Sequence, residues 1–239
     1  MPDHTIFNER PESQDRALKV IEKLGYTIVP RSEAEKKRGS RRAVLFTEEL
    51  RSFLSHQTYQ FGTEDRFFSG GSIAKAMQTV DQFSAAGLYA ENKAIYELLC
   101  AGKSMEEDLP DGTRQSFDLS FIDFEHPENN TFQVTDEFEV ERPNGKFARP
   151  DIVVLVNGIP LVVIECKKSS VDVMEGVNQN IRNWGDEYIP HLFRYTQLVL
   201  AVNPDKVLYG TCGTPAKYFV SWHEDDKEWL NDWCRKCSP

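Results

Sequence analysis

The sequence predicts an α/β fold in which a mixed β-sheet is flanked by helices and preceded by a helical N-terminal half. Apolar residues recur at helical spacing through much of the first 110 residues. From residue 115 onward, apolar and polar residues alternate with the period of half-buried strands. We therefore expect a helical part over residues 1–110 to pack on a sheet-containing core over residues 111–239, within one continuous domain.

The N-terminal helices are predicted from apolar spacing and from the glycines that end them. Leu18, Ile21 and Leu24 lie on one helical face, and Gly25 follows them directly. Gly87 divides the last of the predicted stretches into two helices. These stretches span residues 12–24, 45–60 and 71–101.

The strands are predicted from alternation and from short apolar runs bounded by turn residues. They span residues 116–124, 131–142, 152–156, 161–165, 197–202, 206–210 and 217–222. Residues 126–130 form a turn between the first two strands. A helix over residues 172–184 separates the fourth strand from the fifth.

The composition argues against some classes of protein. With 28 lysines and arginines against 38 aspartates and glutamates, the net charge is −10, which argues against a protein that grips nucleic acid with its whole surface. No apolar run approaches the roughly 18 residues that span a bilayer, and the polar start lacks a secretory signal. We therefore expect a cytoplasmic protein with no membrane contact.

The five cysteines are odd in number and scattered, unlike a disulfide framework. Cys234 and Cys237 form a C-x-x-C pair, but a structural zinc site needs two further ligands, and no second pair exists. A reduced C-terminal tail is the preferred interpretation, with zinc as the minor alternative.

One segment carries the most informative pattern. Asp151 begins an apolar strand, and Glu165 and Lys167 lie at the end of the next one. Asn157-Gly158 between the two strands is the strongest short-range signal for a β-hairpin. The sequence therefore predicts two carboxylates and an ammonium at one end of a buried hairpin.

The length of the hairpin loop decides which residues face each other. A three-residue loop over residues 157–159 sets Asp151 opposite Glu165, about 5 Å away on the same face. Lys167, two residues after Glu165, shares that face. A two-residue loop instead sets Asp151 opposite Ile164, so the site then needs a bulge or a local twist.

These charges are costly to bury unless they are paired or bind a metal. The structural alternatives are a salt bridge between Lys167 and a carboxylate, or solvent exposure at the strand ends. The functional interpretation is a magnesium site with Asp151, Glu165 and the backbone carbonyl of Cys166 as ligands, because this ion prefers hard oxygen ligands. Magnesium polarises a phosphate and lowers the pKa of a water, while a nearby lysine orients that water or offsets charge, which suits phosphodiester hydrolysis.

Asp151 with Glu165-Cys166-Lys167 is similar to the PD-(D/E)xK nuclease signature. The surrounding sequence resembles the N-terminal nuclease domain of the restriction (R) subunit of type I restriction-modification enzymes, most clearly over residues 91–224. The stretches that carry this resemblance are residues 122–142, 148–169 and 189–195. The resemblance implies a restriction-endonuclease-like fold, magnesium, cleavage of double-stranded DNA, and fusion to an ATP-driven DNA motor.

The same resemblance identifies further positions. In the family a Gln-x-x-x-Tyr pair follows the lysine on the next helix, and Gln179 matches the glutamine, which implies a catalytic role for it. Asn183, followed by Trp184, stands where the family has the tyrosine. The first helix of the family often carries an acidic residue that supports the site, and Gln14 occupies that place here.

One dense basic cluster lies in the N-terminal half and consists of Lys36, Lys37, Arg38, Arg41 and Arg42. It is interpreted as a loop that contacts DNA phosphates, and Lys168 beside the predicted site is expected to add a further contact. The alternative is a solvated, exposed turn.

No G-x-x-x-x-G-K-[ST] phosphate loop occurs, so the motor and its ATP site are absent from these residues. We expect a fragment of an R subunit whose partners are double-stranded DNA and the modification and specificity subunits. The alternatives are a catalytically silent module that docks DNA or protein, and a different PD-(D/E)xK nuclease. A catalytically silent module is disfavoured because Asp151, Glu165 and Lys167 are all present. The similar sequence on either side of these residues favours the restriction subunit over a different nuclease.

Overall fold

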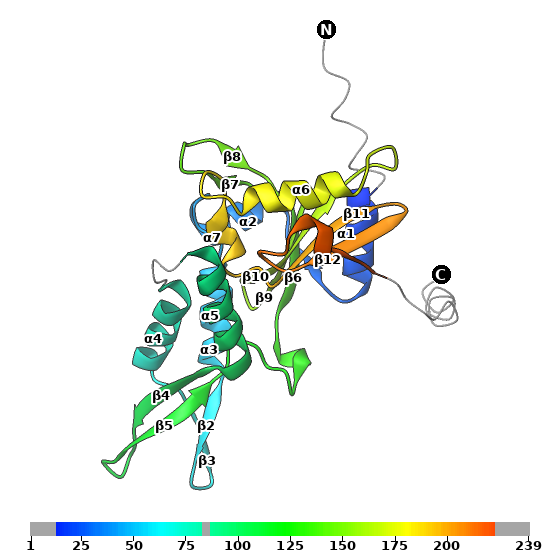
Figure 1. Cartoon of the computed structure of the whole chain (residues 1–239). Coiled ribbons are helices and arrows are strands. Elements are labelled where there is room, and N and C mark those ends of the chain that lie inside the picture. The colour runs from blue at the N-terminus through cyan, green and yellow to red at the C-terminus, as the bar shows by residue number, and fades with distance from the viewer. Residues whose placement is uncertain (1–12, 83–86, 223–239) are drawn as a thin grey trace.

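A seven-stranded mixed sheet forms the centre of the computed structural model, which describes residues 13–82 and 87–222 (Figure 1). In spatial order its strands are β1 (Thr27–Ile28), β6 (Phe132–Asp136), β9 (Ile152–Val156), β10 (Ile159–Cys166), β11 (Leu198–Asn203), β12 (Lys206–Gly210) and β13 (Val220–Ser221). The pairs β1–β6 and β10–β11 are parallel, and the other neighbours are antiparallel. The C-x-x-C pair considered for zinc lies outside the described residues.

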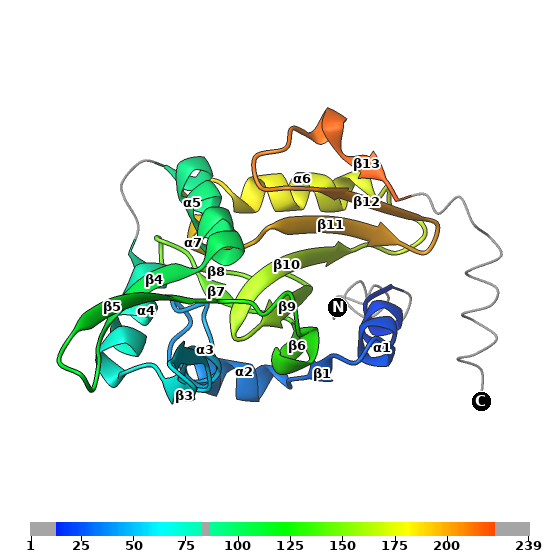
Figure 2. The same cartoon turned by 90° about the horizontal axis from the view of Figure 1, so that it is seen from below.

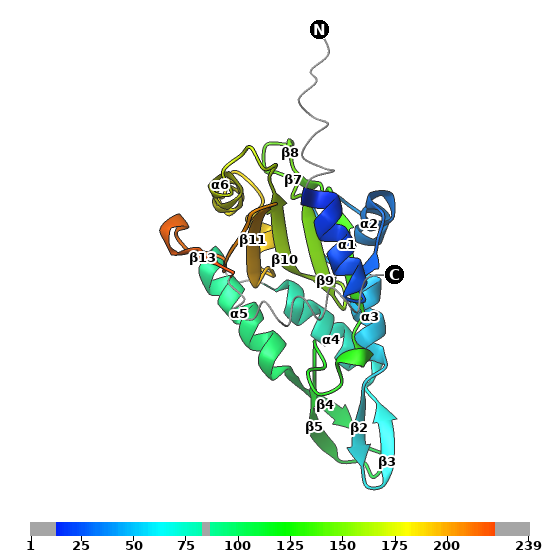
Figure 3. The ribbon, with the colours of Figure 1, turned by 90° about the vertical axis from the view of Figure 1, so that its right-hand side faces the viewer.

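A helix lies on each face of this sheet (Figure 3). Helix α1 (Asp15–Lys23) covers one face, where Leu18 packs into a cluster with Ile152 and Cys166. Helix α6 (Met174–Asn183) covers the other, where Val177 packs with Ala201. Helices flanking a mixed sheet confirm the predicted fold class, and the arrangement is consistent with a restriction-endonuclease-like fold.

Much of the N-terminal half forms a lobe beside the sheet (Figures 1 and 2). Its elements are α3 (Thr47–Ser55), α4 (Gly70–Asp81), α5 (Leu88–Ala101), the hairpin of β2 (Thr58–Phe61) with β3 (Glu64–Phe67), and the hairpin of β4 (Lys103–Asp108) with β5 (Arg114–Leu119). One buried apolar cluster joins the lobe to the sheet, with Phe46 and Leu50 from the first and Val153 and Val163 from the second. Across the described ranges, no helix combines the length and apolar character needed to cross a bilayer.

Four short elements complete the described fold, and three of them contribute residues to one cavity. They are α2 (Arg31–Arg38), β7 (Val140–Glu141), β8 (Phe147–Ala148) and α7 (Pro190–Phe193). The backbone N–H of Glu141 donates to the carbonyl of Arg41 at 2.9 Å, which joins the segment after α2 to β7. Residues 38, 141 and 191 line the same cavity, so the three segments meet there.

The predicted helix over residues 45–60 is wrong in its last part. The helix ends at Ser55, and Thr58–Phe61 pairs instead with Glu64–Phe67 around a turn at Gly62. Threonine, tyrosine and phenylalanine fit a pleated surface, so cross-strand pairing overrides the helical pattern here. The helix pair around Gly87, by contrast, is confirmed as α4 and α5.

The predicted strand over residues 131–142 is broken by a turn. Strand β6 ends at Asp136, and Glu137 adopts a left-handed backbone conformation with φ of 52°. The chain then leaves the sheet, and β7 pairs with β8 in a separate hairpin. The predictions also missed α2, α7 and β4, all of them short or rich in charged residues.

Candidate active site

The hairpin of β9 and β10 turns in two residues, the shorter of the two loop lengths considered from the sequence. Val156 pairs with Ile159 across Asn157 and Gly158. These two turn residues have φ of 50° and 79°, the left-handed conformations of a type I′ turn. Asn-Gly is the pair that this turn favours, which explains the shorter loop.

A β-bulge restores the register that the site requires. The pairing shifts between Pro160 and Val162, which makes Leu161 an extra residue on β10. Beyond the bulge the pairing continues regularly, and one position past the last pair Glu165 lies opposite Asp151. The bulge, which was the alternative to a longer loop, thus brings both carboxylates to one end of the hairpin.

The two carboxylates have different contacts. The backbone N–H of Cys166 donates to Oδ2 of Asp151 at 2.7 Å and holds that side chain across the hairpin. Glu165 is 0% exposed, and its Oε2 has no hydrogen-bond partner within the described residues. Because a buried carboxylate oxygen without a partner is costly, this atom marks a place for a ligand.

Burial raises the pKa of both carboxyl groups. The pKa of Glu165 lies well above its ordinary value because the group is buried and because the charge of Asp151 is near. The pKa of Asp151 is raised by burial, while the N–H of Cys166 and the charge of Lys167 oppose that rise. A bound cation would relieve this repulsion between the two neighbouring carboxylates.

Lys167 is held by helix α6 rather than by a carboxylate. The side chain is 8% exposed, and its Nζ donates to Oε1 of Gln179 at 2.9 Å and to the carbonyl of Cys166 at 3.2 Å. In the part of the chain that the structure describes, Lys167 forms no ion pair with Asp151 or Glu165. The salt-bridge alternative is therefore not what the structure shows, and Gln179 faces the site.

Asn183 is a site residue that the sequence pattern left without a role. It lies four residues after Gln179, on the same face of α6. Its Nδ2 donates to Oε1 of Glu165 at 3.4 Å, and the side chain is 2% exposed. Helical spacing from Gln179 was the signal that could have placed it here.

Gln14 and Glu137 form a small hydrogen-bonded group next to the backbone of Asp151. The Nε2 of Gln14 donates to the backbone carbonyl of Asp151 at 3.2 Å and to Oε1 of Glu137 at 3.5 Å. Glu137 also pairs with Arg149 at 2.8 Å. No sequence pattern indicated Glu137, because its position depends on the turn that ends β6.

The donor set fits a hard divalent cation. Asp151 and Glu165 offer carboxylate oxygens, and the carbonyl of Cys166 lies within hydrogen-bond distance of Lys167 at the same site. Residues 13–82 and 87–222 contain no group of three or more His, Cys, Asp or Glu side chains placed to hold a metal. An ion here would depend on two carboxylates, a carbonyl and water, which is the kind of ligand set that magnesium accepts.

Only part of the basic cluster is the loop that we predicted, because Arg41 and Arg42 lie in the non-helical segment between α2 and α3. Lys36, Lys37 and Arg38 form the last turn of α2, which ends at Gly39 with φ of 72°. Arg38 is 5% exposed, so the solvated-turn alternative is also wrong for it.

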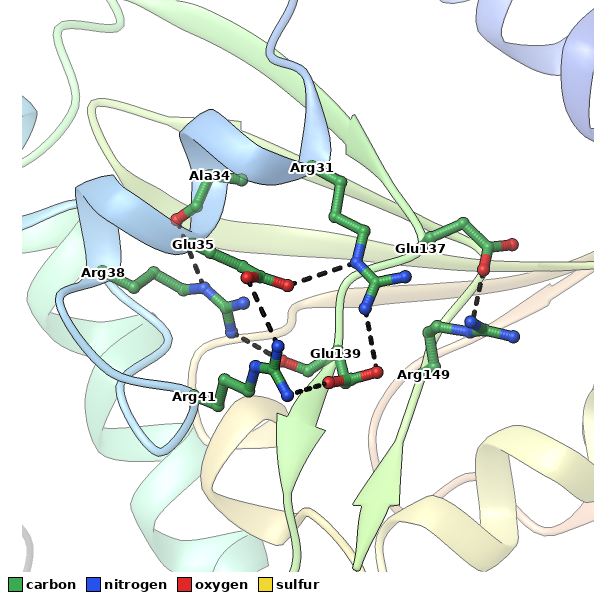
Figure 4. Close-up of polar contacts among 8 residues, drawn as sticks. All are labelled: Arg31, Ala34, Glu35, Arg38, Arg41, Glu137, Glu139 and Arg149. Atoms are coloured by element: carbon green, nitrogen blue, oxygen red, sulfur yellow. Dashed lines mark hydrogen bonds and ion pairs between the residues drawn. The ribbon is translucent and has the colours of Figure 1, made fainter.

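Most other cations of this cluster are neutralised within the protein. Figure 4 shows this for Arg41, which pairs with Glu35 and Glu139. The ion pairs join Lys37 to Glu33 and Glu49, Arg41 to Glu35 and Glu139, and Arg42 to Glu141. Lys36 is exposed and Lys168 is half-buried beside the site. Contact of these residues with DNA stays a prediction.

Residues 6–218 match the model of the family described as type I restriction enzyme R protein N terminus. The type I restriction enzyme HindI endonuclease subunit of Haemophilus influenzae is 27% identical over 231 residues, which are 93% of this chain and 21% of that protein. The putative type I restriction enzyme MjaIXP endonuclease subunit of Methanocaldococcus jannaschii is 32% identical over 162 residues, 64% of this chain and 15% of that protein.

The chain thus spans about a fifth or less of the length of these curated relatives. The family match, in contrast, covers most of the chain and includes α1, the hairpin of β9 and β10, and α6. Because that match extends over most of the chain, this protein belongs to the type I restriction enzyme R protein N-terminus family.

Proposed function

We propose that this chain is the endonuclease domain of a type I restriction enzyme R subunit and hydrolyses phosphodiester bonds of double-stranded DNA with magnesium. The observation that carries the proposal is the pair of half-buried Asp151 and buried Glu165, with Lys167 at the same end of the hairpin. One oxygen of Glu165 has no hydrogen-bond partner in the part of the chain that the structure describes. The names of the relatives, all endonuclease subunits, support the same activity.

Each residue has a distinct role in this proposal. Asp151, Glu165 and the carbonyl of Cys166 would hold magnesium, which when bound polarises a phosphodiester oxygen and lowers the pKa of a water. Lys167 places a positive charge where negative charge develops on the phosphate. Gln179 orients the ammonium of Lys167 through its 2.9 Å hydrogen bond, without neutralising that charge as a carboxylate would.

The rest of the proposal follows from the family. The double-stranded DNA would be delivered by an ATP-driven motor elsewhere in the R subunit, and the modification and specificity subunits would recognise the target sequence. The acidic balance of this chain agrees with DNA being held mainly by other parts of the complex. Within the described residues, Cys100, Cys166 and Cys212 form no disulfide, which fits the reducing cytoplasm.

Calorimetric titration of magnesium, combined with a plasmid-nicking assay, tests the proposal. We expect the wild type to bind magnesium and Glu165→Gln to lose that binding, because the substitution keeps the shape of the side chain and removes its charge. Glu107→Gln is the matched control, since Glu107 is also buried but accepts hydrogen bonds from Ser69 in another part of the fold.

The outcomes separate the nuclease from the docking module. Binding and nicking that vanish together in Glu165→Gln support the metal-dependent endonuclease. A wild type that binds no magnesium, even with DNA present, favours a catalytically silent docking module instead.

A further inference from the structure

A cavity of about 420 Å³ lies among α2, the segment after β7, and α7. Four arginines line it, Arg38, Arg42, Arg142 and Arg194, against two carboxylates. This concentration of positive charge stands out in a chain whose net charge is −10. The size falls in the range of roughly 300–1,000 Å³ that is usual for small-molecule sites.

Two of the four arginines are neutralised by neighbouring carboxylates. Arg42 pairs with Glu141 at 2.8 Å, and Arg194 pairs with the buried Glu91 at 2.6 Å. Arg38 and Arg142 form no ion pair within the described residues. The uncompensated charge in the cavity therefore belongs to these two side chains.

Arg38 is buried and only partly satisfied (Figure 4). Its Nε donates to the carbonyl of Ala34, and its Nη1 donates to the carbonyls of Ala43 and Glu139. The Nη2 group has no hydrogen-bond partner among residues 13–82 and 87–222. The guanidinium lies 4.0 Å from the ring centre of Phe138, and this contact helps to fix its position. The N–H groups of Nη2 can therefore donate to a ligand.

The other side of the cavity offers two more groups. Arg142 is held by the carbonyl of Glu187 at 3.0 Å and lies 3.9 Å from the ring centre of Tyr188. His191 lines the cavity, and its Nε2 is buried without a hydrogen-bond partner in the described part of the chain. Two fixed guanidinium groups and an unpaired imidazole nitrogen are suited to a phosphate, whose oxygens accept hydrogen bonds from several directions.

We propose that this cavity is a second site, separate from Asp151 and Glu165, that binds the phosphate group of a nucleotide. The cavity is several times larger than a phosphate, and Ala43, Val44 and Leu45 give it apolar walls against which a base can pack. The nucleotide is either free in solution or part of a DNA strand, since the recognised chemistry is the same. Binding in this cavity requires no metal at the hairpin of β9 and β10.

Calorimetry on the whole chain in EDTA tests this site, because EDTA removes any metal-dependent binding of phosphate. The probes are inorganic phosphate, adenosine monophosphate and a short duplex with 5′-phosphates. We expect one-to-one binding of adenosine monophosphate that Arg142→Ala weakens about tenfold or more, the loss expected for a charged hydrogen-bonding partner. Arg66→Ala is the control, since Arg66 pairs with Glu64 on the hairpin of β2 and β3.

A second variant and a local signal make the result decisive. Arg38→Met should also weaken binding, and if it fails to fold, Arg142→Ala alone carries the test. The ring signals of His191 in NMR spectra should shift with each probe that binds.

If the duplex binds more tightly than adenosine monophosphate, the result supports a phosphate site that takes DNA. If adenosine monophosphate binds more tightly, the result supports a phosphate site that takes a free nucleotide. No binding by any probe, or equal affinities in Arg142→Ala and the wild type, overturns the proposal.

Discussion

Glu165 lies at the end of β10 with none of its surface exposed and with one oxygen unpartnered in the described residues. Its raised pKa means that the folded protein takes up a proton more readily than the unfolded chain. The contribution of Glu165 to the free energy of unfolding is therefore largest below the ordinary pKa of 4.5. It falls as the pH rises through the pKa of Glu165 in the folded protein. Near neutral pH, burial of the Glu165 carboxyl group therefore lowers the free energy of unfolding of the metal-free protein.

We predict that Glu165→Gln stabilises the metal-free protein at pH 8 by about 1–3 kcal/mol, because it removes a buried charge that Asp151 repels. Magnesium should raise the melting temperature of the wild type and leave that of the variant unchanged. Thermal unfolding between pH 5 and 8, with EDTA or with magnesium, measures both effects. A variant less stable than the wild type in EDTA would show that Glu165 has a stabilising structural partner.

Lys167 and Gln179 form a pair at the same site. We predict that Lys167→Ala reduces plasmid nicking by roughly 100-fold or more, because it removes the positive charge expected to stabilise the developing charge on the phosphate. Gln179→Ala should reduce nicking by roughly tenfold, since the ammonium remains but loses its orienting acceptor.

Circular dichroism and magnesium titration of both variants provide the control. The fold and the magnesium affinity should stay close to those of the wild type, because the carboxylates are unchanged. If Lys167→Ala fails to fold, the lysine has a structural role instead.

At the scale of elements, the turn between β9 and β10 anchors the hairpin that carries the site. Gly158 has a left-handed conformation, and a Cβ placed on it would lie 2.3 Å from the carbonyl oxygen of Phe46. That close approach allows the backbone N–H of Phe46 to donate to the carbonyl of Gly158 at 2.9 Å. The turn is therefore packed against the segment that leads into α3.

We predict that Gly158→Ala lowers the free energy of unfolding by about 3 kcal/mol, through backbone strain together with the clash at Phe46. Gly112→Ala is the matched control, because Gly112 has φ of 82° in another hairpin turn but no atom within 4 Å of its added Cβ. It should lower the free energy of unfolding by about 1–2 kcal/mol, the strain alone. Urea denaturation measures both variants, and equal losses would contradict the packing argument.

At the scale of the whole molecule, the site is completed where the α6 layer meets the sheet. A Cβ placed on Gly176 of α6 would lie 3.0 Å from Cβ of Ala201 and 3.5 Å from Cβ of Glu165. The glycine thus allows the helix to approach the sheet closely. This approach brings Gln179 and Asn183 to Lys167 and Glu165.

We predict that Gly176→Ala lowers nicking by roughly tenfold because it pushes α6 away from the sheet and displaces Gln179. Its effect on stability should stay within about 1–2 kcal/mol, since the gain in helix propensity offsets part of the clash. Adding Ala201→Gly makes room for the new methyl group and should restore nicking. If the double variant is no more active than Gly176→Ala, spacing between the layers is not the cause.

The sequence by itself determined the fold class, the buried hairpin and its charged end. Periodic apolar residues, the Asn-Gly turn and the spacing of Asp151, Glu165 and Lys167 are local features, and local features are what a sequence pattern records. The same reasoning failed at residues 58–61 and at Glu137, where cross-strand pairing and a positive φ decide the conformation.

Only the tertiary structure decided how the site is assembled. The bulge at Leu161 sets the register, and the contacts of Gln14, Gln179 and Asn183 depend on how the helical segments at both faces pack on the sheet. The basic cluster was misread for a similar reason, because its partner Glu139 lies about 100 residues away. Register shifts and long-range ion pairs arise from packing between distant elements, and no local pattern specifies them.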